Sequence, residues 1–355
     1  MNPMMHMKSR LCGTALLYAA LVAAHVQAAP VGAALDRPAV QSALAARSML
    51  QAAAKAGNTL VAVGERGIVL LSGDQGKTWR QVQVPVSVGL TAVRFVDARQ
   101  GWIVGHGGVV LASADGGQTW VRQFDGTQAA QVALKDAQTR GDARALAEAE
   151  RLVADGADKP FLDLHFFDAQ HGLIVGAYNL AFETHDGGKT WQSIASRLDN
   201  PKALHLYSVR ARGNEVVIVG EQGLVLRSTD GASSFQRLNT PYKGSFFTAE
   251  LPGTTEIVVA GLRGNVWKSS NAGLAWTQVA SPMPVSFTAS ALDDQGRLWL
   301  ATQAGMVWQL GPDALLPTPV KLPPLNGLLP IGQGQALALS SAGAIATSLT
   351  EGPTK

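Results

Sequence analysis

The amino-acid sequence predicts an all-β fold, a seven-bladed β-propeller of four-stranded antiparallel blades. Two repeated signals predict it. An apolar run that ends in a Gly-x-x-Gly turn, or a variant of that turn, occurs seven times, ending at residues 67, 108, 179, 223, 264, 305 and 343. Five of these turns are followed by a short strand and an eight-residue box of the form Ser-x-Asp-x-Gly-x-Thr-Trp. Units of about 40 residues with four short strands cannot bury their faces alone, so they must stack, and radial stacking makes a propeller.

The first 28 residues are predicted to be a secretory signal peptide. Lys8 and Arg10 precede an apolar run, residues 11–26, and small residues follow it, so we expect cleavage after Ala28. The run is shorter than a membrane-spanning helix requires. The single cysteine, Cys12, lies at the start of this run, whereas a lipoprotein needs its cysteine after it. We therefore expect residues 29–355 to form a thiol-free propeller that is periplasmic or secreted and has no integral membrane segment.

The charge balance argues against a nucleic-acid partner. The chain has 29 Lys and Arg residues against 26 Asp and Glu residues, and no extended basic tract. Removal of the signal peptide takes away basic residues and no acidic ones, which leaves a nearly neutral chain. Nucleic-acid binding requires a concentrated basic surface. We expect a monomer with a protein partner.

One repeat shows how each blade is built. Residues 91–96 are expected to form its first strand, 102–105 its second, 109–113 its third and 120–124 its fourth. The Gly turn joins the second and third strands, and the box joins the third and fourth.

The box residues are interpreted as structural. An Asp or Asn side chain accepts hydrogen bonds from the N–H groups of its own turn, and the aromatic residue that ends the box packs between neighbouring sheets. We therefore expect neither calcium nor catalysis at these positions. The acceptor positions are Asp74, Asp115, Asp186, Asp230 and Asn271, and the aromatic positions are Trp79, Trp120, Trp191, Phe235 and Trp276.

The ends of the propeller are predicted to close on each other. Residues 344–349 can form the third strand of the last blade, but no box and no good fourth strand follow them. We expect residues 38–44 to supply that fourth strand, and residues 48–54 to begin blade one.

An insertion between blades two and three, residues 127–159, breaks the period. It is predicted to form two helices, 128–139 and 143–155, with a turn at 140–141 and Gly156 as the stop. This connection lies on the same face as the Gly turns. Two interpretations are open: the insertion forms part of a binding surface, or it packs on its own blade as decoration.

The box resembles the Asp-box, or bacterial neuraminidase repeat, which also occurs in sialidases. Those enzymes have six blades, an Arg-Ile-Pro motif and a catalytic Tyr–Glu pair, and nothing around Tyr178, Tyr207 or Tyr242 matches that pair. The histidines show no local metal-binding spacing. We therefore predict no catalytic residue, no cofactor and no metal. His165, with Arg94 and Arg210 in similar slots of other blades, either lines the central channel or is simply a satisfied polar group.

Two long repeats point to a narrower family. FVDARQGWIVGHGGVVLASADGGQTW, from Phe95, and FFDAQHGLIVGAYNLAFETHDGGKTW, from Phe166, resemble the photosystem II stability/assembly-factor propellers. The resemblance implies a scaffold that assists an envelope membrane-protein complex, such as a transporter. A carbohydrate-binding or sialidase-like glycoside hydrolase propeller, and a small-ligand sensor, are the alternatives. Candidate partner-binding residues on the Gly turns are Glu65, Arg66, His106, Tyr178, Glu221 and Arg263.

Overall fold

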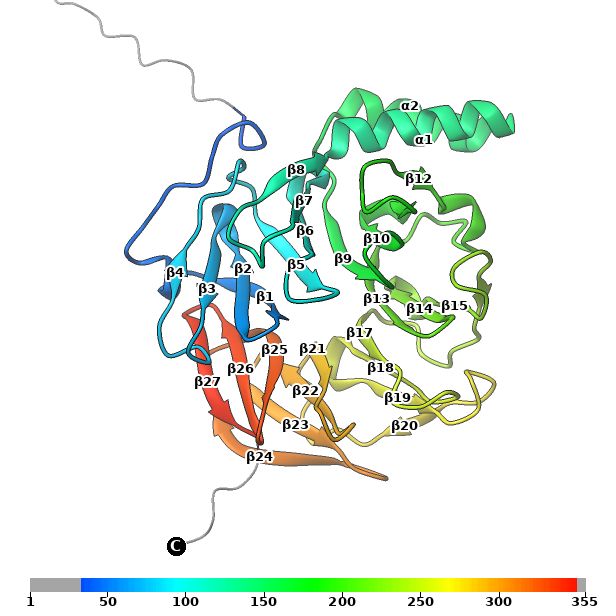
Figure 1. Ribbon diagram of the computed structural model, residues 1–355. Helices are drawn as coiled ribbons and strands as arrows, with labels where there is room; N and C mark the ends of the chain where they lie inside the picture. Colours follow the sequence, from blue (N-terminus) through cyan, green and yellow to red (C-terminus); the bar gives the residue numbers. More distant parts are fainter. Residues whose placement is uncertain (1–32, 350–355) are drawn as a thin grey trace, which may run out of the picture. The chain divides into compact units, whose positions relative to one another are not determined.

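A computed structural model describes residues 33–349, which form seven antiparallel sheets and a helical hairpin (Figure 1). The predicted signal peptide lies outside these residues. Within residues 33–349, no helix has the length and apolar character needed to cross a bilayer. The innermost strands contact one another in the cyclic order β1, β5, β9, β13, β17, β21, β25 and back to β1. This closed ring confirms the predicted seven-bladed propeller.

The first four blades follow the chain in order. Their strands are β1 (Leu50–Ala56), β2 (Thr59–Gly64), β3 (Val69–Ser72) and β4 (Arg80–Gln81); β5 (Leu90–Phe95), β6 (Gly101–Gly105), β7 (Val110–Ser113) and β8 (Val121–Phe124); β9 (Phe161–Phe166), β10 (Gly172–Gly176), β11 (Ala181–Thr184) and β12 (Gln192–Ser193); and β13 (Leu206–Arg212), β14 (Glu215–Gly220), β15 (Val225–Ser228) and β16 (Gln236–Arg237).

The last three blades are built in the same way, except that the seventh has three strands. Their strands are β17 (Phe246–Glu250), β18 (Ile257–Gly261), β19 (Val266–Ser269) and β20 (Thr277–Val279); β21 (Phe287–Leu292), β22 (Leu298–Thr302), β23 (Met306–Leu310) and β24 (Leu315–Lys321); and β25 (Leu325–Gly332), β26 (Gln335–Ser340) and β27 (Gly343–Ser348).

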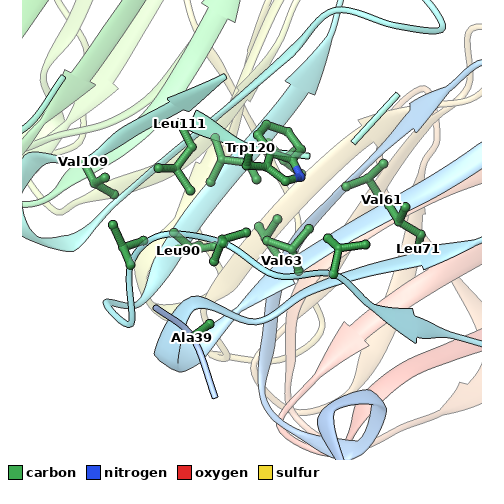
Figure 2. Packing of buried hydrophobic residues seen from close by; sticks show 14 of the residues in the cluster. Ala39, Val61, Val63, Leu71, Leu90, Val109, Leu111 and Trp120 are labelled. Carbon is green, nitrogen blue, oxygen red and sulfur yellow. The ribbon is translucent and has the colours of Figure 1, made fainter. Parts of the chain in front are cut away.

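The hydrophobic core lies between neighbouring blades. Figure 2 shows the cluster between blades one and two, where Val61, Val63 and Leu71 face Leu111 and Trp120. These side chains are almost fully buried. Each sheet buries both faces, which explains why the second strands are continuous apolar runs instead of alternating ones.

The Gly turns are short 3-10 turns whose second residue has a left-handed backbone. This residue is Arg66, Gly107, Tyr178, Gln222 or Arg263 in blades one to five. The residue after it is also left-handed, which is why glycine recurs there. Asn179, with φ of 62°, fills that slot in blade three, as its tolerance for this conformation predicts.

Each box closes on itself through the side chain of its acidic residue. The Asp115 carboxylate accepts bonds from the Thr119 N–H (3.0 Å) and the Thr119 hydroxyl (2.6 Å), and Trp120 Nε1 donates to the Gly117 carbonyl (2.9 Å). The same bonds recur around Asp74 and Asp186. They hold the pKa of Asp74 near 2, chiefly through the Thr78 hydroxyl and N–H. These carboxylates are occupied by their own turns.

The predicted closure of the last blade is wrong. Residues 38–44 do not pair with β27 but run beside blade one, where the Ala39 N–H donates to the Val84 carbonyl (3.1 Å) and Gln81 Nε2 donates to the Val40 carbonyl (3.0 Å). Side-chain amides of blade one thus donate hydrogen bonds to backbone carbonyls of this segment. A 3-10 turn, η1 (Ala45–Arg47), contacts β27 instead. The first strand of blade one begins at Leu50, two residues after the predicted start.

The insertion is a helical hairpin, as predicted. It consists of α1 (Gly126–Arg140) and α2 (Ala143–Asp155), capped by the side chains of Asp125 and Asp142. Gly141, with φ of 65°, makes the tight turn between the helices. The hairpin contacts the Gly turn of blade two and β12 of blade three (Figure 1). It therefore packs across the junction of two blades.

Candidate functional site

The Gly turns and the connections between blades lie on one face of the propeller, which we call the Gly-turn face. In an antiparallel blade, the start of the first strand and the end of the second strand lie on the same side. The pairing of Leu90 with Gly105 and of Leu206 with Gly220 shows this arrangement. The helical hairpin begins and ends on this face, and the boxes lie on the opposite one.

A cleft of about 460 Å³ lies between the hairpin and blade three. Its apolar lining comes from Ala149 and Leu152 of α2 and from Leu180 and Phe182 of blade three. Phe182 is buried beneath it. Charged side chains surround this apolar floor; those of the hairpin are Asp136, Arg140, Glu148, Arg151 and Asp155.

Tyr178 forms one wall of the cleft and is exposed over 58% of its surface. The Lys159 ammonium lies 5.4 Å from the centre of its ring. The centre of the same ring lies 4.5 Å from that of His205. A large aromatic side chain so exposed, beside an apolar hollow, is a common feature of protein-binding surfaces.

Aromatic side chains continue from Tyr178 toward the central channel. The Tyr207 ring lies 6.2 Å from His205 and 5.1 Å from Phe247, and both Tyr207 and Phe247 line the channel. Glu221 accepts a bond from the His205 N–H (2.9 Å) and lies 3.2 Å from His205 Nδ1. The Gly-turn face thus has a continuous path of rings from the cleft to the channel, which we call the aromatic path.

The six predicted binding residues are only partly brought together. Tyr178 and Glu221 meet through His205, which the prediction did not include. Arg66, His106 and Arg263 are exposed on separate turns, and Glu65 is half-buried on the first turn. Within residues 33–349 none of these four forms an ion pair. Sequence reasoning also missed Tyr207 and Phe247. Both residues lie at the start of the first strand of a blade, which borders the mouth of the channel, and this position could have identified them.

The channel, with a volume of about 570 Å³, contains a buried charge network. Asp163 accepts from Arg210 Nη1 (2.5 Å), the Ser208 hydroxyl (3.0 Å) and the Val209 N–H (3.1 Å). Arg210 also reaches Glu250 (3.4 Å), and Arg94 lies 3.9 Å from Asp163. We call Arg94, Asp163, Arg210 and Glu250 the channel network.

The channel network favours the charged forms of Asp163 and Arg210. Burial opposes ionisation of Asp163, but the guanidinium groups of Arg210 and Arg94 hold its pKa below the usual value. Burial, with the charges of the same two arginines, lowers the pKa of His165 to about 4. His165 and the two arginines line the channel, and both arginines are also paired with Asp163. Both interpretations from the sequence apply.

A family model, described as "Photosynthesis system II assembly factor YCF48", matches residues 71–149 and 143–307. These ranges together cover more than half of the chain. The chain belongs to this family.

Two curated relatives match at higher identity over short regions. The photosystem II assembly lipoprotein Ycf48 of Synechococcus sp. (strain CC9902) is 36% identical over 92 residues, 26% of each chain. The chloroplastic photosystem II stability/assembly factor HCF136 of Oryza sativa subsp. japonica is 32% identical over 96 residues, 26% of this chain and 21% of the relative. The chain thus spans about a quarter of the length of these relatives. Both are named as assembly factors and neither as an enzyme.

The fold is shared with a solved structure described as "YCF48 bound to D1 peptide". It superposes with a TM-score of 0.64 at 18% identity, covering 89% of this chain and 100% of the other. This likeness shows that the two chains share a fold.

Proposed function

We propose that this YCF48-family chain is an exported, non-enzymatic assembly or stability factor that holds a peptide segment of a membrane-protein complex in the cell envelope. The observation that carries the proposal is the apolar cleft beside exposed Tyr178 on the Gly-turn face. The mature chain acts in the periplasm, as the predicted signal peptide implies. A transporter is the class of complex that we would test first, since nothing in the sequence marks a photosynthetic cell.

The chemistry of the cleft suits a peptide. Its floor is apolar, while Arg140 and Lys159 at its edge are already paired with carboxylates of the hairpin. Arg151 makes no ion pair within residues 33–349, so it is available to a carboxylate of the partner. An extended segment with one or two apolar side chains and a nearby acidic group would match both features. The aromatic path gives such a segment further surface toward the channel.

The relatives support the same class of function. Curated relatives are named as photosystem II assembly or stability factors, and one solved structure of this fold is of YCF48 bound to a D1 peptide. A member of the family outside photosynthesis would keep the mode of binding and change the partner. The side chains of the aromatic path and of the cleft would determine which partner is bound.

The test is an affinity pull-down from envelope membranes with a surface variant of the cleft. Tyr178→Asn removes the ring and keeps a residue that tolerates the left-handed backbone at this position. Gln222→Asn, at the equivalent turn position of blade four, is the matched control. We expect one membrane complex to be enriched with the wild type and the control, and lost with Tyr178→Asn.

Deletion of residues 127–159 is a harsher test, because Ala129 and Leu152 of the hairpin pack into the core of blade three. Its thermal unfolding must therefore be measured beside the pull-down. Absence of any enriched membrane protein with the folded wild type would contradict the assembly-factor proposal. If the Tyr178→Asn variant still enriches the complex, the binding site is not at the cleft.

A further inference from the structure

Two histidines and a glutamate meet on the box side of blade three, opposite the Gly-turn face. His171 Nε2 lies 2.9 Å and His185 Nε2 lies 3.2 Å from the same oxygen, Oε1 of Glu183. The two imidazole rings are stacked, with their centroids 4.5 Å apart. Glu183 is buried, whereas His185 is mostly exposed, so the group faces solvent on one side.

The blade geometry explains why these residues meet although they are far apart in the sequence. In the β10–β11 hairpin Gly172 pairs with Thr184, so the next pair outward is His171 with His185. Glu183, opposite Leu173, is the diagonal neighbour of His171. The spacing of these three residues along the chain matches no local metal motif. The pairing of β10 with β11 brings them together.

Blade two has the same backbone without these side chains. Its hairpin pairs Gly101 with Ser113, so the positions of the cluster are occupied there by Gln100, Ala112 and Ala114. In both blades an aspartate, Asp97 or Asp168, holds the preceding turn through two backbone N–H groups. Blade architecture alone therefore does not require the two histidines and the glutamate.

We propose that His171, Glu183 and His185 bind a divalent transition-metal ion, with Zn²⁺ as the best match. Two ligands at about 2.0–2.1 Å from a tetrahedral zinc ion are about 3.3 Å apart, close to the separations of the two nitrogens from Oε1. Two imidazoles and one carboxylate, with a fourth position open to solvent, are ligands that zinc accepts.

The surroundings of the cluster fit a cation. Arg197 Nη1 binds the other oxygen of Glu183, Oε2, at 2.7 Å, which fixes the carboxylate and leaves Oε1 to the metal. Arg197 also donates to the Ala232 carbonyl. The Asp168 carboxylate, which accepts from the Gln170 and His171 N–H groups, adds negative charge nearby. Asp230 lines the same shallow depression.

The experiment is a calorimetric titration of the exported chain, purified without a polyhistidine tag, with ZnCl₂. We expect one zinc ion per chain for the wild type. The double variant His171→Gln, His185→Ala places at these two positions the residue types that blade two has there. It should therefore fold normally, while its zinc affinity falls at least about 100-fold. His106→Ala, which removes an exposed histidine from the opposite face, should leave the titration unchanged.

A second readout does not depend on the double variant. Co²⁺ bound to the wild type should show the intense visible absorption of a tetrahedral site, and Glu183→Gln should weaken that absorption. The proposal is overturned if the wild type binds no zinc, or if the double variant binds it as tightly as the wild type. Neither result bears on the cleft, which lies on the other face.

Discussion

The channel network allows a sharp test of how the propeller is stabilised. The change is Asp163→Asn, which preserves shape and removes one buried negative charge. One oxygen of Asp163 accepts three bonds, from Arg210, Ser208 and Val209, and the other accepts from the Leu164 N–H (2.9 Å). An asparagine has only one acceptor oxygen, so its NH₂ group must face a donor in either orientation.

The size of the effect follows from the charge count. Arg94 and Arg210 are balanced by Asp163 and Glu250, and His165 is neutral at pH 7 because its pKa is about 4. The substitution leaves one uncompensated positive charge in the channel, where blades two to five contribute the four members of the network. Loss of one partner of a buried ion pair costs about 3–5 kcal/mol, and the misplaced donor adds to that loss. We expect the free energy of unfolding to fall by at least about 3 kcal/mol.

The assay is equilibrium urea unfolding at pH 7.5, followed by tryptophan fluorescence. Asp294→Asn is the control: Asp294 also lines the channel but is exposed, 4.0 Å from Lys55, so its loss should cost under about 1 kcal/mol. In a double-mutant cycle with Arg210→Gln, the two losses should be far from additive. A change of less than about 1 kcal/mol for Asp163→Asn would refute the view that the network is a coupled buried unit.

Three further predictions concern single residues. Between pH 6.5 and 4 the unfolded chain protonates His165 while the folded chain does not, so acidification costs up to about 3 kcal/mol; His165→Gln should remove this part of the pH dependence measured by urea unfolding. Gly108→Ala should destabilise far more than Gly141→Ala in thermal unfolding, although both have positive φ, because an added Cβ at Gly108 lies 2.6 Å from backbone and at Gly141 meets nothing within 4 Å. Asp115→Ala should cost about 1–3 kcal/mol in urea unfolding, and Asp115→Asn clearly less, since Asn271 makes the equivalent backbone bond in blade five; equal losses would contradict the structural interpretation of the box.

The repeat was predictable because its turns are chemically demanding. Glycine or asparagine is needed at each left-handed position and an acceptor at each box, so both appear in the sequence at a fixed spacing. In blade two the predicted strands 91–96, 102–105, 109–113 and 120–124 lie within one residue of β5 to β8. The helices of the insertion were also predicted, since Gly141 and Gly156 mark their ends, although α1 begins two residues before the predicted start at 128.

The parts that were missed depend on contacts between distant segments. Residues 38–44 were expected beside β27, but the amides of Gln81 and Gln83 offer their backbone better partners on blade one. The aromatic path was missed for a similar reason. His205 and Tyr207 lie at the start of blade four, far in the sequence from Tyr178 and Phe247, and only the ring of blades places them between those two residues. Periodicity predicts which strands form, and it does not show which side chains of different blades meet.

Blade three carries three additions to the repeat, and these bear on function. A blade needs only apolar strands and a box to stack, as blade two shows with Gln100, Ala112 and Ala114 at the positions of His171, Glu183 and His185. Blade three adds a helical hairpin, an exposed Tyr178 in a left-handed turn and a cluster of two histidines around a buried Glu183. Exposed aromatic surface of this kind commonly marks an interaction site. Because neighbouring blades stack without these features, the stacking of the propeller does not explain them, and the two binding sites that we propose would.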